Sequence, residues 1–176
     1  MRGSTFTFNG INSEEFGIKV IKHDLILPPK RERKLQIPNR HGTYDFGSQI
    51  YDERAIQVRC IVERKLSRAE LREVAFWLSK KSRLIFFDEP EKYYVGELYS
   101  TDIFETFPNE VMREFTLDFI CEPFAYGETV VSPIKAGSNA VRYKGTASTP
   151  TKIFLRNMSD RSAINLSLTL VKRRGR

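Results

Sequence analysis

Three acidic side chains, Asp88, Glu89 and Glu91, fall within the stretch LIFFDEPEKYYVGEL, residues 84–98. Carboxylates this close can act as a general acid and a general base, provided that one is desolvated so that its pKa rises. Here they surround Pro90 between two strand-like runs, and proline fixes φ at the second position of a turn. The pattern therefore predicts a hairpin with a solvated acidic tip rather than a catalytic pair.

Other reactive side chains are few and scattered. The two histidines, His23 and His41, and the two cysteines, Cys60 and Cys121, form no CxxC, HxH or HExxH motif. Both cysteines lie in alternating, strand-like patterns, where a thiol behaves as a small hydrophobic group; a reducing, cytosolic site of synthesis is expected. The chain also lacks GxSxG, GxxxxGK[ST] and GxGxxG. We expect no enzyme, no metal site and no cofactor.

The net charge of +7 is unevenly distributed. Two clusters supply most of the excess: Lys30, Arg31, Arg33 and Lys34, and the C-terminal Lys172, Arg173, Arg174 and Arg176. A basic tail can bind phosphate backbones without sequence preference, but such a run is more often a solvated end, and no recognition motif accompanies it. The apolar run 84–87 is too short to span a bilayer, and residues 1–10 lack the apolar core of a signal peptide, so no membrane anchor is expected.

One helix is predicted, over about residues 67–81. Ser67 and Glu70 have the spacing of a capping box, and Leu66 and Leu71 occupy the flanking staple positions. Apolar residues then follow at helical spacing and predict one face packed on a sheet: Leu71, Val74, Ala75 and Leu78.

Alternating apolar residues predict strands at 5–8, 16–23, 54–63, 83–87, 93–105 and 110–124. Asn9-Gly10 ends the first strand in a tight turn. The second should place Phe16, Ile18, Val20 and Lys22 on one face. Residues 27–34, LPPKRERK, cannot form a central strand because two prolines remove ladder donors, so they are a loop or an edge arm. Residues 38–49 are expected to form a loop.

These elements predict an α+β fold that is mostly β: an antiparallel, sandwich-like domain over residues 1–127 with one helix and protruding hairpins or arms. Beyond Gly127 the composition shifts towards Ser, Thr, Ala and Gly, with weaker strands near 140–144, 151–157 and 163–171. Residues 128–176 are too few to form an independent core, and we expect them to pack against another part of the protein or a partner.

Taken in order, the segments resemble the siphophage distal tail proteins. Residues 6–20, FTFNGINSEEFGIKV, resemble the family's F-x-F-N-G opening, and Pro38 to Gly42 stand where it carries a P-G-R-[DN]-G-like turn, with Asn39 in place of the usual glycine. Tyr51, Arg54 and Ile56 match Y-x-x-R-x-I. The remaining matches are Trp77-Leu78 to L-x-x-W-L, LIFFDEPEKYYVGEL to the family hairpin, and FTLDFICEPFAYG to F-x-x-x-F-x-C-x-P-F-x-Y.

The resemblance, which covers about residues 5–127, implies a structural virion protein made in the bacterial host cytoplasm. Its homohexameric ring would connect the tail tube protein to the tail hub or receptor-binding proteins, with a channel through which DNA passes. Residues 137–157 resemble the start of the family's second, galectin-like domain, which is reduced here or belongs to a longer protein; its carbohydrate binding is not carried over. The candidate structural and oligomer-interface residues are Phe8, Asn9, Gly10, Gly17, Pro38, Gly42, Trp77, Asp88, Pro90, Tyr94, Pro123 and Phe124.

A carbohydrate- or nucleic-acid-binding β module is the alternative function. Strand aromatics can stack on sugars or bases, although they more often belong to a core or a subunit contact. The aromatic residues concerned are Tyr93, Tyr94, Tyr99, Phe104, Phe107 and Phe115.

Overall fold

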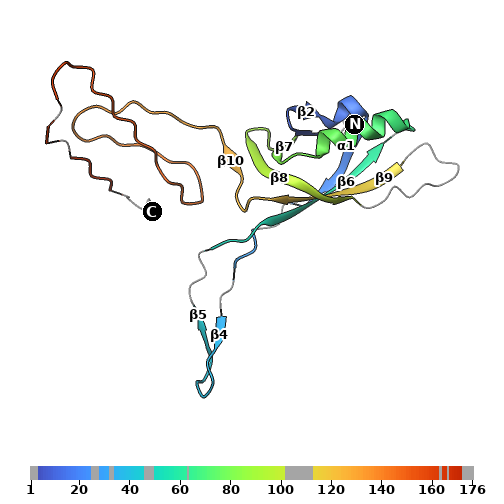
Figure 1. Ribbon diagram of the computed structural model, residues 1–176, viewed down its shortest axis with the longest axis horizontal. Helices are drawn as coiled ribbons and strands as arrows, with labels where there is room; N and C mark the ends of the chain where they lie inside the picture. Colours follow the sequence, from blue (N-terminus) through green and yellow to red (C-terminus); the bar gives the residue numbers. More distant parts are fainter. Residues whose placement is uncertain are drawn as a thin grey trace. The chain divides into compact units, whose positions relative to one another are not determined.

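The computed structural model describes residues 4–24, 28–31, 34–45, 50–62, 64–101, 113–162, 164–165 and 167–171 (Figure 1). The chain divides into two units, Met1–Asn139 and Ala140–Arg176. All regular secondary structure of the described residues lies in the first unit. The basic C-terminal tail from Lys172 lies outside the described residues.

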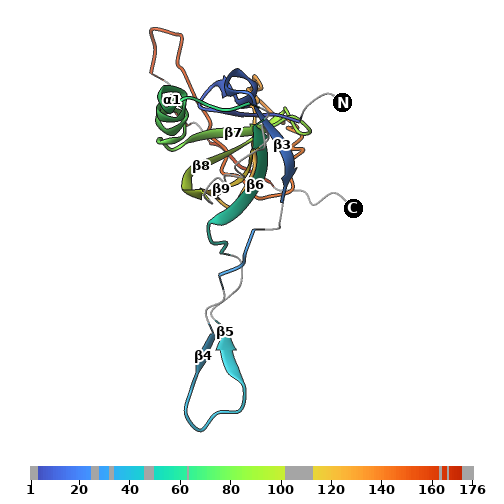
Figure 2. The same ribbon diagram turned by 90° about the vertical axis from the view of Figure 1, so that its right-hand side faces the viewer.

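An antiparallel sheet of eight strands dominates the first unit, in the order β2-β1-β7-β8-β9-β6-β3, with β10 also paired to β8. Figure 2 shows β7, β8, β9, β6 and β3 side by side in this order. The fold is mostly β with one α-helix, as the sequence predicts. The strands are β1 (Phe6–Phe8), β2 (Ile11–Asn12), β3 (Ile18–His23), β6 (Arg54–Val62), β7 (Ser82–Phe86), β8 (Lys92–Thr101), β9 (Arg113–Cys121) and β10 (Tyr126–Gly127).

The sheet curls over a single core. Strands β1 and β9 are not neighbours in the strand order, yet the rings of Phe6 and Phe8 lie 6.1 and 5.3 Å from the ring of Phe119. Ser4, just before β1, forms an isolated bridge with Val20 of β3. Inward-facing side chains of distant strands therefore fill one interior, which is the sandwich-like arrangement expected from the alternation.

The first turn has the predicted chemistry. Asn9 and Gly10 both adopt positive φ, 51° and 79°, between β1 and β2. A two-residue turn of this hand matches the twist of the paired strands, and asparagine and glycine tolerate it best. Residues Ser13–Phe16 then form a 3-10 helix, η1, which ends at Gly17 with φ 69°.

In strand β3, Lys22 lies on the opposite face from the one that the sequence predicts. The pairing of β3 with β6 shifts between Val20 and Lys22, so Ile21 is the extra residue of a β-bulge. A bulge reverses the alternation after it. Lys22 is consequently exposed, and His23 takes the inward position that a regular strand would have given to Lys22.

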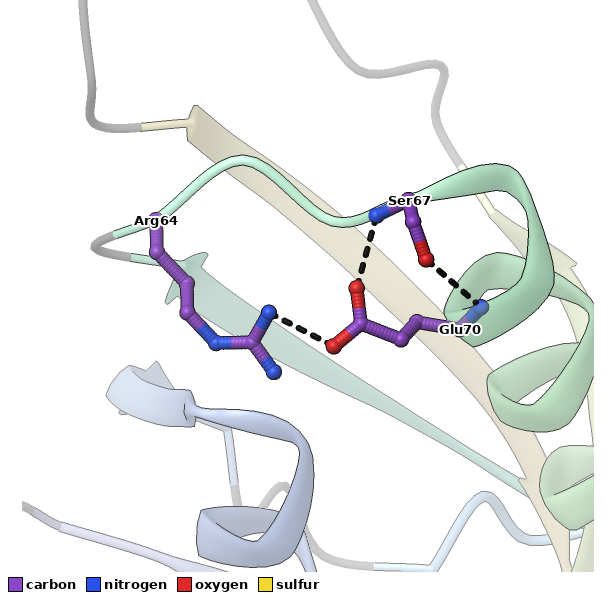
Figure 3. A network of polar contacts seen from close by, with 3 residues as sticks. All are labelled: Arg64, Ser67 and Glu70. Atoms are coloured by element: carbon purple, nitrogen blue, oxygen red, sulfur yellow. Dashed lines mark hydrogen bonds and ion pairs between the residues drawn. The ribbon is translucent and has the colours of Figure 1, made fainter.

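The helix α1 (Arg68–Leu78) begins at the predicted cap. The Ser67 side chain accepts a hydrogen bond from the Glu70 amide, and the Glu70 carboxylate accepts one from the Ser67 amide, 2.7 Å away (Figure 3). The guanidinium of Arg64 lies 2.7 Å from the same carboxylate. The helix ends at Leu78, three residues before the predicted end, and Ala75 of the predicted apolar face is exposed.

Trp77 fixes the helix against the sheet. Its ring stacks 4.8 Å from Phe16 and 5.5 Å from Phe6, and its indole N–H donates to the main-chain carbonyl of Phe8. Val74 and Leu78 are buried on the same side of the helix. The helix thereby covers the start of the chain, η1 and β1, as well as the sheet.

Two further strands form a separate ladder. β4 (Lys34–Gln36) pairs with β5 (Thr43–Asp45). Residues 43–45 were expected in a loop, and that prediction is wrong: local alternation over three residues is too short to be recognised, and the strand exists because β4 pairs with it. Lys30 and Tyr51 form a bridge nearer the base of this hairpin, so the described residues within 28–52 constitute an arm, as one of the two interpretations of residues 27–34 predicts.

The second unit contains no helix or strand among its described residues, so the weak strands expected there are not formed in the part described. Many of its apolar side chains are exposed, among them Phe154 (88%) and Ile164 (81%). The expectation that residues 128–176 have no independent core stays a prediction. The predicted boundary after residue 127 stays a prediction.

Candidate assembly interface

The acidic turn closes the β7–β8 hairpin, as predicted. The Glu89 amide donates to the Phe86 carbonyl at 3.3 Å, and the Lys92 amide donates to the Glu89 carbonyl at 3.0 Å. Asp88, Pro90 and Glu91 are exposed at its surface. The described residues contain no group of three or more His, Cys, Asp or Glu side chains placed to hold a metal ion.

His23 lies against this turn. Its Nε2 atom is 3.2 Å from an Asp88 carboxylate oxygen, and its ring stacks 4.1 Å from Phe86. The His23 side chain is only 10% exposed, and its Nδ1 atom has no hydrogen-bond partner among the described residues. Sequence reasoning missed this contact because the bulge at Ile21, which turns His23 inward, leaves no mark in the alternation.

A layer of rings continues from His23 across the interior. Phe86 meets Tyr94 edge to face at 6.1 Å, and the guanidinium of Arg54 lies 5.3 Å from the centre of the Tyr94 ring. Arg54 is 9% exposed, and its Nε atom lacks a partner among the described residues. Burial raises the pKa of the Tyr94 hydroxyl, with the Arg54 charge opposing the shift. Among the described residues, the two buried side-chain polar atoms without a partner therefore belong to this ring layer, on His23 and Arg54.

The thiols offer no nucleophile. Cys60 and Cys121 are free and buried, and burial raises the pKa of each to about 12. A thiol with so high a pKa holds almost no thiolate near neutral pH, and only the thiolate attacks. The cysteines are core residues.

The side chains of the arm are exposed or half-buried throughout its described residues. Leu35 and Tyr44 are directly paired across β4 and β5, so they share one face of the hairpin. They are 53% and 43% exposed, and no described residue of the arm is buried. The Arg31 side chain pairs with Asp52 at 2.6 Å near its base, and Arg40 lies 5.5 Å above the Tyr44 ring near its tip.

The predicted site residues do not gather in one place. Phe8, Trp77 and Tyr94 belong to the core, and Asn9, Gly10 and Gly17 shape turns at positive φ. Pro38 and Gly42 lie at the end of the arm, where Gly42 has φ 81°, and Asp88 and Pro90 lie in the acidic turn. Phe124, after Pro123, packs edge to face on Tyr51 at 5.1 Å. Their contribution to an interface stays a prediction.

A second bulge lies beside an exposed aromatic ring on the outer face of the sheet. The pairing of β8 with β9 shifts between Leu98 and Ser100, and Tyr99, the extra residue, is 77% exposed. It borders a shallow groove in which the Asp118 carboxylate accepts hydrogen bonds from Gln57 at 3.0 Å and Ser100 at 2.9 Å.

No helix among the described residues is long and apolar enough to cross a membrane.

Comparison with known proteins identifies the fold. Residues 7–121 match a family model described as phage tail protein RIFT-related domain. The crystal structure of Dit (gp 19.1) of phage SPP1, described as a paradigm of the hub adsorption apparatus in phages that infect Gram-positive bacteria, is similar to 71% of this chain, with a TM-score of 0.58 and 21% sequence identity. The match covers 52% of that protein, so the chain spans about half its length. No curated protein sequence matches the chain.

Proposed function

The chain belongs to the family of phage tail proteins with a RIFT-related domain, and on that premise we propose that it is a distal tail subunit of a siphophage virion. It forms a hexameric ring that joins the tail tube to the tail hub or receptor-binding proteins and leaves a channel for DNA. Its role is structural rather than enzymatic. The likeness in fold to SPP1 Dit supports this proposal.

The exposed arm is the observation that carries the proposal. A two-stranded hairpin alone is marginally stable in water, and here its large apolar side chains, Leu35 and Tyr44, are exposed. Burial of two such side chains against a neighbour would contribute roughly 1.5–3 kcal/mol each. An arm of this kind is suited to contact a second subunit.

A closed ring requires two different surfaces on each subunit, because head-to-tail contacts join unlike faces. The arm provides one of them, and the compact sheet with its covering helix provides a rigid body for the other. Buried thiols and an exposed acidic turn are consistent with a protein whose surfaces bind partners.

The mass of the purified protein tests the proposal. Light scattering and negative-stain electron microscopy should show a hexameric ring, either alone or after addition of the tail tube protein. A monomer under both conditions would contradict it. Deletion of residues 172–176 should leave the ring intact, since the basic tail is not assigned to the contact.

Binding of a carbohydrate is the second candidate, favoured by Tyr99 beside the Asp118 groove. An exposed aromatic ring next to hydrogen-bonding side chains is a usual arrangement for a polar ligand with one apolar face. Retention on immobilised glycans that is lost in Tyr99→Ala but kept in Tyr126→Ala would favour it. Equal retention of both variants, or none of the wild type, would exclude it.

A further inference from the structure

We infer that the arm of one subunit docks on a second copy of the chain, in the shallow groove between β3 and the acidic turn. The inference rests on the proposed ring and names the surface that the arm would meet. Ser4, Ile21, His23, Phe87 and Asp88 line this groove together with their neighbours on β3. Four observations support the docking.

The groove has an exposed apolar rim. Ile21 is 49% exposed because it points away from the interior, opposite to the buried Val20, and Phe87, the first residue after β7, is 51% exposed. The Phe87 amide donates a hydrogen bond to the Thr5 carbonyl at 3.2 Å, and the Phe87 ring lies edge to face with the His23 ring. Ile21 and Phe87 therefore expose large apolar side chains from a main chain that hydrogen bonds and strand pairing hold in place.

The arm exposes a pair of apolar side chains similar in kind to the pair on this rim. Leu35 and Tyr44 lie opposite each other on one face of the β4–β5 hairpin. An aliphatic and an aromatic side chain on the arm would therefore meet an aliphatic and an aromatic side chain on the groove. Contact between them would remove from water the main apolar surface that each part exposes.

The charges of the two parts are opposite. The acidic turn carries three carboxylates within four residues, 88–91. The described residues of the arm, within 28–52, include four basic residues and two acidic ones, and one acid, Asp52, is paired with Arg31 at 2.6 Å. Lys22, the cation at the groove, is already paired with Asp24 at 2.8 Å, so it does not repel the arm as a free charge would. Complementary charge favours this pairing and orients it.

The edge of β3 is open at the same place. On its outer side Val20 donates its amide to the Ser4 carbonyl at 2.7 Å, and beyond Val20 the described residues give this edge no further strand partner. An open edge accepts an extended segment through main-chain hydrogen bonds. The groove therefore combines an edge, an apolar rim and acidic charge within a few residues.

Disulfide trapping between two single-cysteine variants tests the contact in the full chain. Leu35→Cys and Ile21→Cys proteins would be mixed in equal amounts under conditions where the wild type forms rings, then oxidised. Only a link between subunits can join the two new cysteines. Cys60 and Cys121 are buried with pKa values of about 12, so the native background is low.

The inference expects a disulfide-linked dimer from this mixture and from Leu35→Cys with Phe87→Cys. Leu35→Cys with Phe76→Cys is the matched control, because Phe76 is 70% exposed on the outside of α1. If rings form but neither groove variant is trapped above this control, the inference is wrong while the ring stands. If the wild type forms no ring alone or with the tail tube protein, the proposed function fails, and the inference with it.

Charge reversal provides a second test that leaves the core untouched. Glu89→Lys/Glu91→Lys should weaken ring formation, and the same change of charge in Glu14→Lys/Glu15→Lys, on the exposed side of η1, should not. Equal ring formation by the two double variants, with unchanged circular dichroism, would overturn the role of the acidic turn.

Discussion

The indole Nε1–H of Trp77 donates a hydrogen bond to the main-chain carbonyl of Phe8, 2.7 Å away, across 69 residues of sequence. This bond joins the helix to β1, whose carbonyl is buried beneath the ring. It also fixes the orientation of the Trp77 ring between Phe6 and Phe16. The start of the chain and the helix therefore stabilise each other.

Removal of this hydrogen bond should lower the free energy of unfolding. Trp77→Phe leaves the buried Phe8 carbonyl without its donor, and an unsatisfied buried group costs about 1–3 kcal/mol. Trp77→Ala should cost about 3–5 kcal/mol because it also opens a cavity. Urea denaturation measures both. Phe76→Ala, in the next position but 70% exposed, should change the stability by less than about 0.5 kcal/mol. Equal effects at the two positions would contradict this account of the helix.

Gly96 is required by the close approach of β8 and β9. A Cβ atom at this position would lie 2.6 Å from the Ile120 carbonyl oxygen and closer still to the Cys121 sulfur. Gly96→Ala should therefore lower the free energy of unfolding by about 1–3 kcal/mol through overpacking. At Gly127 the nearest atom would be the flexible end of Lys92 at 3.4 Å, so Gly127→Ala is the control with a small effect. Thermal denaturation of the two variants distinguishes them.

The capping box should make stability depend on acid pH. Hydrogen bonds from the Ser67 amide and from Arg64 lower the pKa of Glu70 from 4.5 to about 2. A carboxyl whose pKa is lower in the folded state stabilises the fold above pH 4.5, and this contribution is lost as the pH falls from 4.5 to 2.

The stability difference between wild type and Glu70→Gln should accordingly be constant near neutral pH and shrink between pH 4.5 and 2. Urea midpoints across this range measure it. Glu73→Gln, an exposed acid on the same helix, is the control. A difference that is independent of pH would show that the charge of Glu70 does not contribute.

The His23–Asp88 contact should couple the end of β3 to the acidic turn. A double-mutant cycle with His23→Gln and Asp88→Asn is expected to give a coupling free energy of about 0.5–1 kcal/mol, because one partner is buried and the other is partly solvated. The exposed Lys22–Asp24 pair, measured in the same way, should give less. A larger coupling for Lys22–Asp24 would contradict the importance of burial at His23.

Local features of the fold were predictable from the sequence because they depend on neighbouring residues. The Ser67–Glu70 capping box and the Asn9-Gly10 turn are defined within four residues, and both are confirmed. The buried face of β9, from Phe115 to Cys121, follows from simple alternation. Turn chemistry alone predicts a hairpin at the acidic stretch 88–91, and this stretch connects β7 to β8.

Tertiary structure decided the features that depend on pairing between distant strands. The bulge at Ile21 arises in the pairing with β6, and only that pairing turns His23 inward towards Phe86 and Asp88. In the same way, the bulge in the pairing of β8 with β9 places Ser100 opposite Asp118, whose carboxylate accepts its hydrogen bond. Strand β5 exists because β4 lies beside it. An alternation pattern records which side chains are apolar, but register and bulges are set by a partner strand far along the chain. The sequence by itself therefore determined the elements and their turns. The candidate assembly surfaces depend on how distant strands pair, and only the tertiary structure decided that pairing.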